Sequence, residues 1–155
     1  MFFAIVVLLG AAAPAIQSKP DFSGEWVLNR QASTLSPGAD RMESGVMRIE
    51  HREPVFRNTT TLVAADSRPI SFTYELRSDG GEVSAAQGPP SVTSLRWDGD
   101  ALIFTSQTPG GKGLKISFRY ELIDGGRRIR ATEQLRGTDH DQDNVWIFDR
   151  RGEPR

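Results

Sequence analysis

Residues 21–29 read Asp-Phe-Ser-Gly-Glu-Trp-Val-Leu-Asn and begin a long series of segments with the pattern of β-strands. Successive side chains of a strand point to opposite sides, so Trp26 and Leu28 share one face of this segment. The alternation recurs as far as residue 150 and is strictest over residues 70–77, as in a half-buried antiparallel strand. No segment carries a long apolar stripe with the period of a helix. The chain is therefore predicted to be all-β.

Three Asp-Gly pairs, at 79–80, 98–99 and 124–125, each lie between two segments with the strand pattern. Asp-Gly in this position is a strong hairpin signal, so a hairpin turn is predicted at each pair. About nine strands follow, with no helix long enough for a parallel crossover. Because open sheet edges promote aggregation, we expect a single closed antiparallel up-and-down β-barrel of about 8–10 strands. A two-sheet sandwich is the alternative.

The first 13 residues form an uncharged apolar run, followed by Ala13-Pro14-Ala15, which resembles a signal-peptide cleavage site. The run is shorter than the roughly 20 residues of a membrane-spanning helix. We expect a signal peptide at 1–15, a short disordered segment at 16–20, the barrel domain at 21–151 and a disordered tail at 152–155. The protein would then be exported, periplasmic or secreted, with no stable membrane insertion after cleavage. An uncleaved membrane anchor is the alternative.

Composition narrows the possible partners. The chain has 19 basic and 20 acidic residues, so there is no electrostatic basis for binding nucleic acid. It has no cysteine, which excludes disulfides, thiol nucleophiles and cysteine-ligated metals. Two histidines are too few for a multi-histidine metal site. Alternate acidic residues at 139, 141 and 143 lack the Gly and Glu of an EF-hand loop. We therefore expect no metal and no cofactor.

The combination of Gly24-x-Trp26 with an arginine on the last strand resembles the calycin superfamily, which includes the lipocalins. The opening is similar to that of small exported bacterial lipocalin-like proteins. The resemblance implies that Trp26 packs inside the closed end of the barrel beneath Arg150 or Arg151, with Gly24 beside them. Alternation puts residues 146, 148 and 150 on one face, which favours Arg150. A guanidinium is attracted to the face of an indole ring.

Inward-facing positions of such a barrel would carry aromatic walls and a few polar groups. An apolar pocket with a few placed polar groups is typical of a ligand site. We therefore expect the barrel to bind or carry a small apolar or amphipathic molecule. The candidate ligand-binding residues are His51, Phe56, Asn58, Phe72, Tyr74, Phe104, Phe118, Tyr120 and Glu133.

Two other functions remain open. If Glu133 pairs with Arg57 or Arg96, the interior would be packed, and the chain would be a structural or interaction module of the cell envelope. The third is a hydrolase-like enzyme in which His51 and Glu133 form an acid–base pair. No Gly-x-Ser-x-Gly elbow or catalytic triad supports it, so we expect that the protein is not an enzyme.

Overall fold

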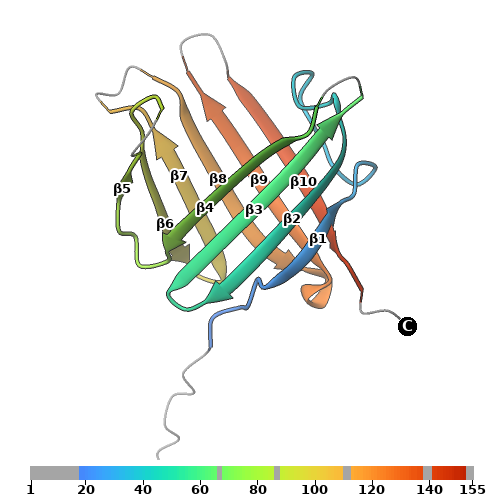
Figure 1. Ribbon diagram of the computed structural model, residues 1–155. Helices are drawn as coiled ribbons and strands as arrows, with labels where there is room; N and C mark the ends of the chain where they lie inside the picture. Colours follow the sequence, from blue (N-terminus) through green and yellow to red (C-terminus); the bar gives the residue numbers. More distant parts are fainter. Residues whose placement is uncertain (1–17, 66–67, 86–87, 110–112, 138–140, 153–155) are drawn as a thin grey trace, which may run out of the picture.

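The computed structural model describes residues 18–65, 68–85, 88–109, 113–137 and 141–152, and the predicted signal peptide lies outside these residues. All its strands belong to one antiparallel sheet, which wraps around a common axis (Figure 1). They are β1 (Gly24–Leu28), β2 (Met42–Arg52), β3 (Val55–Ala64), β4 (Ile70–Arg77), β5 (Val83–Ser84), β6 (Val92–Asp98), β7 (Ala101–Gln107), β8 (Lys115–Ile123), β9 (Arg128–Arg136) and β10 (Gln142–Arg150). The all-β, up-and-down barrel is confirmed, and the sandwich alternative is wrong.

The two ends of the chain meet in the sheet. The order is β4-β3-β2-β1-β10-β9-β8-β7-β6-β5, so every pairing joins consecutive strands except that of β1 with β10. In that pairing Trp26 lies opposite Arg150, and Leu28 lies opposite Phe148. Among the described residues, the only helical segment is a 3₁₀ turn at Asp124–Gly126, and none could span a membrane.

The ladder is interrupted at one place, between β4 and β6, which we call the seam. Within the described residues, no strand pairing joins these two strands. A single bridge connects Asp79 with Arg96, and the Gly80 N–H donates to the Leu95 carbonyl at 2.8 Å. The hairpin predicted at 79–80 is therefore wrong. The run that follows it is the two-residue β5, which pairs with β6 instead of folding back on β4.

The other two Asp-Gly pairs form hairpin turns as predicted. Gly99 and Asp100 separate the paired residues Asp98 and Ala101, and Gly99 has a φ of 61°. The 3₁₀ turn at Asp124–Gly126 joins β8 to β9. Glycine adopts positive φ without the steric penalty of a Cβ, which explains why these turns form here.

The apolar core lies at the end of the barrel where β1 begins. Trp26 and Phe22 are fully buried there, and the Trp26 indole N–H donates to the Phe22 carbonyl at 3.0 Å. The Arg150 guanidinium lies 4.0 Å from the centre of the Trp26 ring and donates to the carbonyls of Ser23 and Gly126. A Cβ at Gly24 would lie 2.8 Å from Arg150 Nη1, so the glycine makes room for the arginine.

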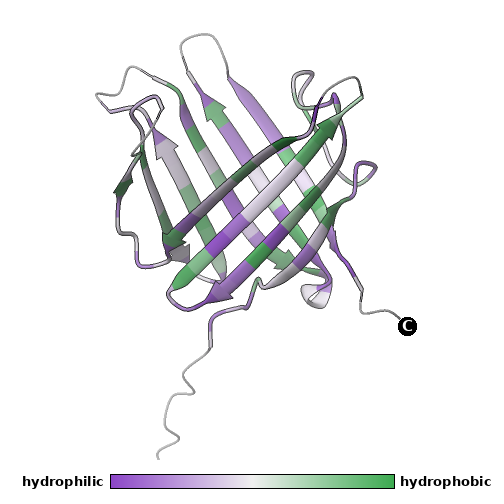
Figure 2. Ribbon diagram, in the orientation of Figure 1, coloured by the Kyte–Doolittle hydropathy of each residue, from purple (hydrophilic) through white to green (hydrophobic). Residues whose placement is uncertain are grey.

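Successive residues of a strand face opposite sides of the sheet, and the hydropathy of the residues accordingly changes repeatedly along the strands (Figure 2). The segment before β1 also contacts the barrel. Lys19 lies over the Trp97 ring and donates to the Gly99 carbonyl, so the described part of the segment predicted to be disordered packs against the closed end. This contact links the chain entering β1 to the β6–β7 turn.

We predict that Trp26→Ala lowers the free energy of unfolding by about 3–5 kcal/mol, because it removes a fully buried indole and the platform under Arg150. Urea unfolding followed by circular dichroism measures this loss. Val27→Ala, on the opposite face of β1, is the matched control and should cost about 1 kcal/mol or less. Unchanged stability with loss of ligand binding would refute a structural role for Trp26.

Candidate functional site

The barrel interior contains two adjoining cavities above the core, where the upper half of the barrel means the half away from the closed end. The larger, of about 300 Å³, is lined by Phe72, Tyr74, Phe104, Ser106, Ile116, Phe118, Tyr120 and Glu133. The smaller, of about 120 Å³, is lined by Met47, Thr60, Leu62, Phe72, Phe118, Tyr120, Ala131, Glu133, Trp146 and Phe148. Four residues line both: Phe72, Phe118, Tyr120 and Glu133. The interior is therefore hollow in its upper half, unlike the packed barrel of the alternative interpretation.

Six of the nine predicted ligand-binding residues line these cavities: Phe72, Tyr74, Phe104, Phe118, Tyr120 and Glu133. The other three face inward at the closed end and line neither cavity. Phe56 is fully buried in the core, Asn58 is held by neighbouring side chains, and the His51 ring packs against Phe22, Phe56 and Trp97. Alternation along the strands identified which residues face inward. It could not show which of them lie in the packed core at the closed end and which line the cavities.

A chain of hydrogen-bonded polar side chains connects Thr60, which lines the smaller cavity, with Tyr74 and Tyr120, which line the larger one. Thr60 donates to Asn58 at 3.1 Å, Asn58 to the Tyr74 hydroxyl at 3.1 Å, and Tyr74 to the Tyr120 hydroxyl at 3.3 Å. Burial raises the pKa of Tyr74 above its ordinary value. Burial, with the nearby Tyr74 and then Glu133, raises the pKa of Tyr120 well above its ordinary value. Both hydroxyls therefore stay protonated at neutral pH, and the Tyr120 hydroxyl, which accepts from Tyr74, donates to no acceptor within the described residues.

The Glu133 carboxylate is held from β10. Its Oε2 accepts hydrogen bonds from Asn144 Nδ2 at 2.9 Å and from the Trp146 indole N–H at 2.8 Å. Asn144 is buried and accepts from the Ser36 backbone N–H at 2.6 Å, which ties the segment between β1 and β2 to the same group. Two donors and a link to a neighbouring loop fix the position of this carboxylate.

The pairing of Glu133 with Arg57 or Arg96 is wrong. Arg57 lies on the outer face of β3, where it forms ion pairs with Glu50 and Glu75, and Arg96 is exposed on β6. Both arginines stand between inward-facing neighbours on regular strands, so the alternation directs them to solvent. No bulge reverses either one.

His51 and Glu133 are not brought together. His51 Nδ1 accepts from the Phe22 backbone N–H at 3.3 Å, and its Nε2 lies 2.8 Å from Glu53. Glu133 bonds to residues of β10 in the other half of the barrel. The acid–base pair expected for a hydrolase therefore does not form. The nearby Ser78 hydroxyl donates to Glu53 and not to His51, so it does not form a serine–histidine pair either.

Glu53 instead holds the seam together at the closed end, in what we call the Glu53 clasp. This carboxylate at the β2–β3 turn accepts from His51, from Ser78 just after β4, and from the Trp97 indole N–H on β6 at 3.0 Å. It thus connects the two strands that the ladder leaves apart. Burial by itself would raise the pKa of Glu53, but the bonds from His51, Ser78 and Trp97 outweigh it and lower the pKa below 4.5.

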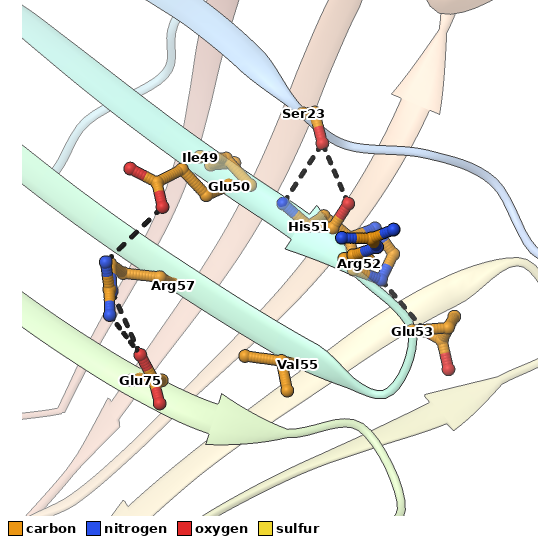
Figure 3. A pocket seen from close by; sticks show the side chains of 9 residues that line it. All are labelled: Ser23, Ile49, Glu50, His51, Arg52, Glu53, Val55, Arg57 and Glu75. Carbon is orange, nitrogen blue, oxygen red and sulfur yellow. Dashed lines mark hydrogen bonds and ion pairs between the residues drawn. The ribbon is translucent and has the colours of Figure 1, made fainter.

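A depression of about 670 Å³ lies outside the barrel at its closed end (Figure 3). Figure 3 shows Arg57 between Glu50 and Glu75, and His51 beside Glu53. Most of the charged side chains of this depression are thus already paired with one another, and the depression is open to solvent. The enclosed apolar walls of the interior make the two cavities the better candidate site.

The seam also provides access to the interior. Phe72 lines both cavities and is still 43% exposed, and Ile70, on the same inward face of β4, is 52% exposed. The upper half of β4 has no paired neighbour on the seam side, so its inward side chains are open to water. Lower down, the Tyr74 ring of β4 contacts the Phe104 ring of β7 inside the barrel, with centroids 4.9 Å apart.

Several residues of the site and of the clasp were not predicted from the sequence. The partners of Glu133, Asn144 and Trp146, stand on the inward face of β10, opposite Glu133 and Ala131 respectively, and knowledge of the strand register would have found them. Glu53, Ser78 and Trp97 are far apart in the sequence and meet only because the barrel curves. The acidic loop begins with Asp139, which lies outside the described residues.

Comparison with known proteins places the fold. No protein-family model and no curated protein matches the chain. Among solved structures, the REP1-NXSQ fatty acid transporter matches with a TM-score of 0.58 at 13% identity, over 86% of this chain and 98% of that chain. Fatty-acid-binding protein 1 of Echinococcus granulosus matches with 0.57 at 7% identity, over 84% and 98%. Secretory abundant heat soluble protein 4 of Ramazzottius varieornatus matches with 0.56 at 13% identity, over 88% and 99%.

At such identities the likeness is one of fold. The chain has the same barrel fold as these fatty-acid-binding proteins, which is the fold that the resemblance drawn from Gly24, Trp26 and Arg150 implied. The first of these structures is named a fatty acid transporter and the second a fatty-acid-binding protein, and a further similar structure is the zebrafish ileal bile-acid-binding protein in complex with cholic acid.

We predict that the Glu53 clasp makes stability depend on pH. Its lowered pKa means that the ionised carboxylate stabilises the fold above pH 4.5, and that this contribution is lost as the pH falls through the folded-state pKa. Wild type should therefore be more stable than Glu53→Gln at neutral pH, and the difference should shrink on acidification. Urea unfolding across that range measures it. Glu50→Gln, on the outer face of β2, should give no such trend, and a constant Glu53 difference would contradict the clasp.

Proposed function

We propose that this protein is an exported carrier that binds a small apolar or amphipathic molecule inside its barrel. The observation that carries the proposal is the hollow upper half of the interior, where aromatic walls surround one carboxylate and one free hydroxyl donor. The larger cavity is at the lower end of the volumes typical of small-molecule sites. The similarity of fold to fatty-acid and bile-acid binding proteins supports the same class of activity.

The mechanism is passive sequestration. A ligand enters along the seam beside Phe72 and buries its apolar part against the Phe104 and Phe118 rings. Transfer of apolar surface from water supplies the free energy, about 25 cal/mol for each Å² buried. The closed end contributes no ligand contacts and keeps the barrel rigid beneath the site.

We predict that Nile red, an uncharged hydrophobic probe, binds with increased fluorescence, and that Ser106→Phe weakens this binding about tenfold by filling the larger cavity. Thr105→Phe places the same ring on the outer face of β7 and serves as the matched control. Fluorescence titration measures both variants. If wild type binds neither Nile red nor any fatty acid, or if both variants bind equally, the carrier function is refuted.

Export rests on the apolar run at 1–13 and the Ala13-Pro14-Ala15 site. We predict that the full chain, expressed in a Gram-negative bacterium, is recovered from the periplasm with Ile16 as its first residue. Fractionation and intact-mass spectrometry test this, and Ala13→Arg with Ala15→Arg should block cleavage. Recovery of uncleaved wild-type chain in the cytoplasm would overturn export, and recovery of it in the membrane would support the anchor.

A further inference from the structure

The charge of the cavity walls is of one sign. Glu133 is the only ionisable acid or base among the lining residues of the two cavities within the described part of the chain, apart from the protonated tyrosines. No lysine, arginine or histidine lines either cavity. The described arginines of β8 and β9 lie outside, where Arg119, Arg128, Arg130 and Arg136 form ion pairs with carboxylates.

The carboxylate has one oxygen to spare. Both hydrogen bonds to Glu133, from Asn144 and from Trp146, go to Oε2, and no hydrogen bond joins Oε1 to the described residues. An ionised carboxylate offers about four acceptor sites on its two oxygens. The group is thus fixed in position by protein donors and still able to accept from a ligand.

Aromatic rings surround the same place. Phe118 and Tyr120 are stacked at 5.6 Å between centroids, and together with Phe72 they line both cavities that Glu133 lines. Phe118 lies opposite Glu133 in the pairing of β8 with β9. Aromatic faces attract cations, and a carboxylate among them adds the opposite charge. The same surroundings disfavour a carboxylate head group, which would stand beside a like charge in an apolar site.

We propose that the ligand is an amphipathic amine, whose protonated head group binds between Glu133 and the rings of Phe118 and Tyr120 while its apolar part fills the larger cavity. This rests on the proposed carrier function and defines its ligand class. It separates the protein from the similar structures named for fatty acids and bile acids, whose ligands carry carboxylates. The specificity comes from the sign of a single interior charge.

The test uses three ligands with one alkyl chain: dodecylamine, dodecanol and laurate, each displacing Nile red at neutral pH below its micellar concentration. Wild type should bind dodecylamine about tenfold more tightly than laurate, with dodecanol between them, as expected for one charge-assisted contact. Glu133→Gln keeps the shape and an acceptor for Trp146 and should abolish the preference for amine over alcohol. Glu121→Gln, on the outer face of β8, is the matched control and should keep it.

The outcomes separate the two proposals. If none of the three displaces the probe, the carrier function fails. If ligands bind but laurate binds as tightly as dodecylamine, or if Glu133→Gln keeps the amine preference, the carrier function stands and the ligand class is wrong. The ranking of the three ligands on wild type needs no variant, so the test holds even if Glu133→Gln fails to fold.

Discussion

The unpaired seam between β4 and β6 is the constraint on which the rest of the structure depends. The backbone ladder joins every other pair of neighbours, whereas this one has only the Asp79–Arg96 bridge and the hydrogen bond from Gly80 to Leu95, so side chains must add to it. At the closed end the Glu53 clasp does so with Ser78 and Trp97. Higher up, Tyr74 of β4 contacts Phe104 of β7 and Tyr120 of β8 inside the barrel. Above these contacts the inward face of β4 is exposed. The side-chain contacts at the closed end and the accessibility of the upper half therefore both follow from the missing strand pairing between β4 and β6.

The distribution of charge differs between the outer face of the barrel and its interior. The outer face carries ion pairs between exposed side chains, each of which contributes little to stability. The cavities contain one carboxylate, and burying it is costly unless it is hydrogen-bonded, which explains why Asn144 and the Trp146 indole are placed beside it. A shared fold does not fix the ligand, and a single charge is enough to change it.

Most of the architecture follows from alternation and turn chemistry. These predicted the barrel and six aromatic or acidic wall residues, because each depends on the alternation of side chains along a strand. The stacking of an arginine on Trp26 came from the family resemblance, and alternation only favoured Arg150 over Arg151. The errors arose where distant segments compete. Asp79-Gly80 has the signal of a hairpin, but the short β5 pairs elsewhere. Glu133 is hydrogen-bonded to residues of the adjacent strand β10, and His51 is hydrogen-bonded to Phe22 and Glu53. Alternation along a strand cannot identify these partners, because they lie on other segments.

Because β1 and β10 are adjacent, the two ends of the barrel domain could be joined and the chain opened elsewhere. The Arg151 N–H donates to the Glu25 carbonyl at 2.8 Å, so the two ends of the barrel domain lie side by side. Among the described residues, the stretch that crosses the seam is the one between β4 and β5. Joining the present ends and opening the chain there would give a circular permutant running from β5 to β4 with every strand pairing retained. The sheet would then begin and end at its own natural gap.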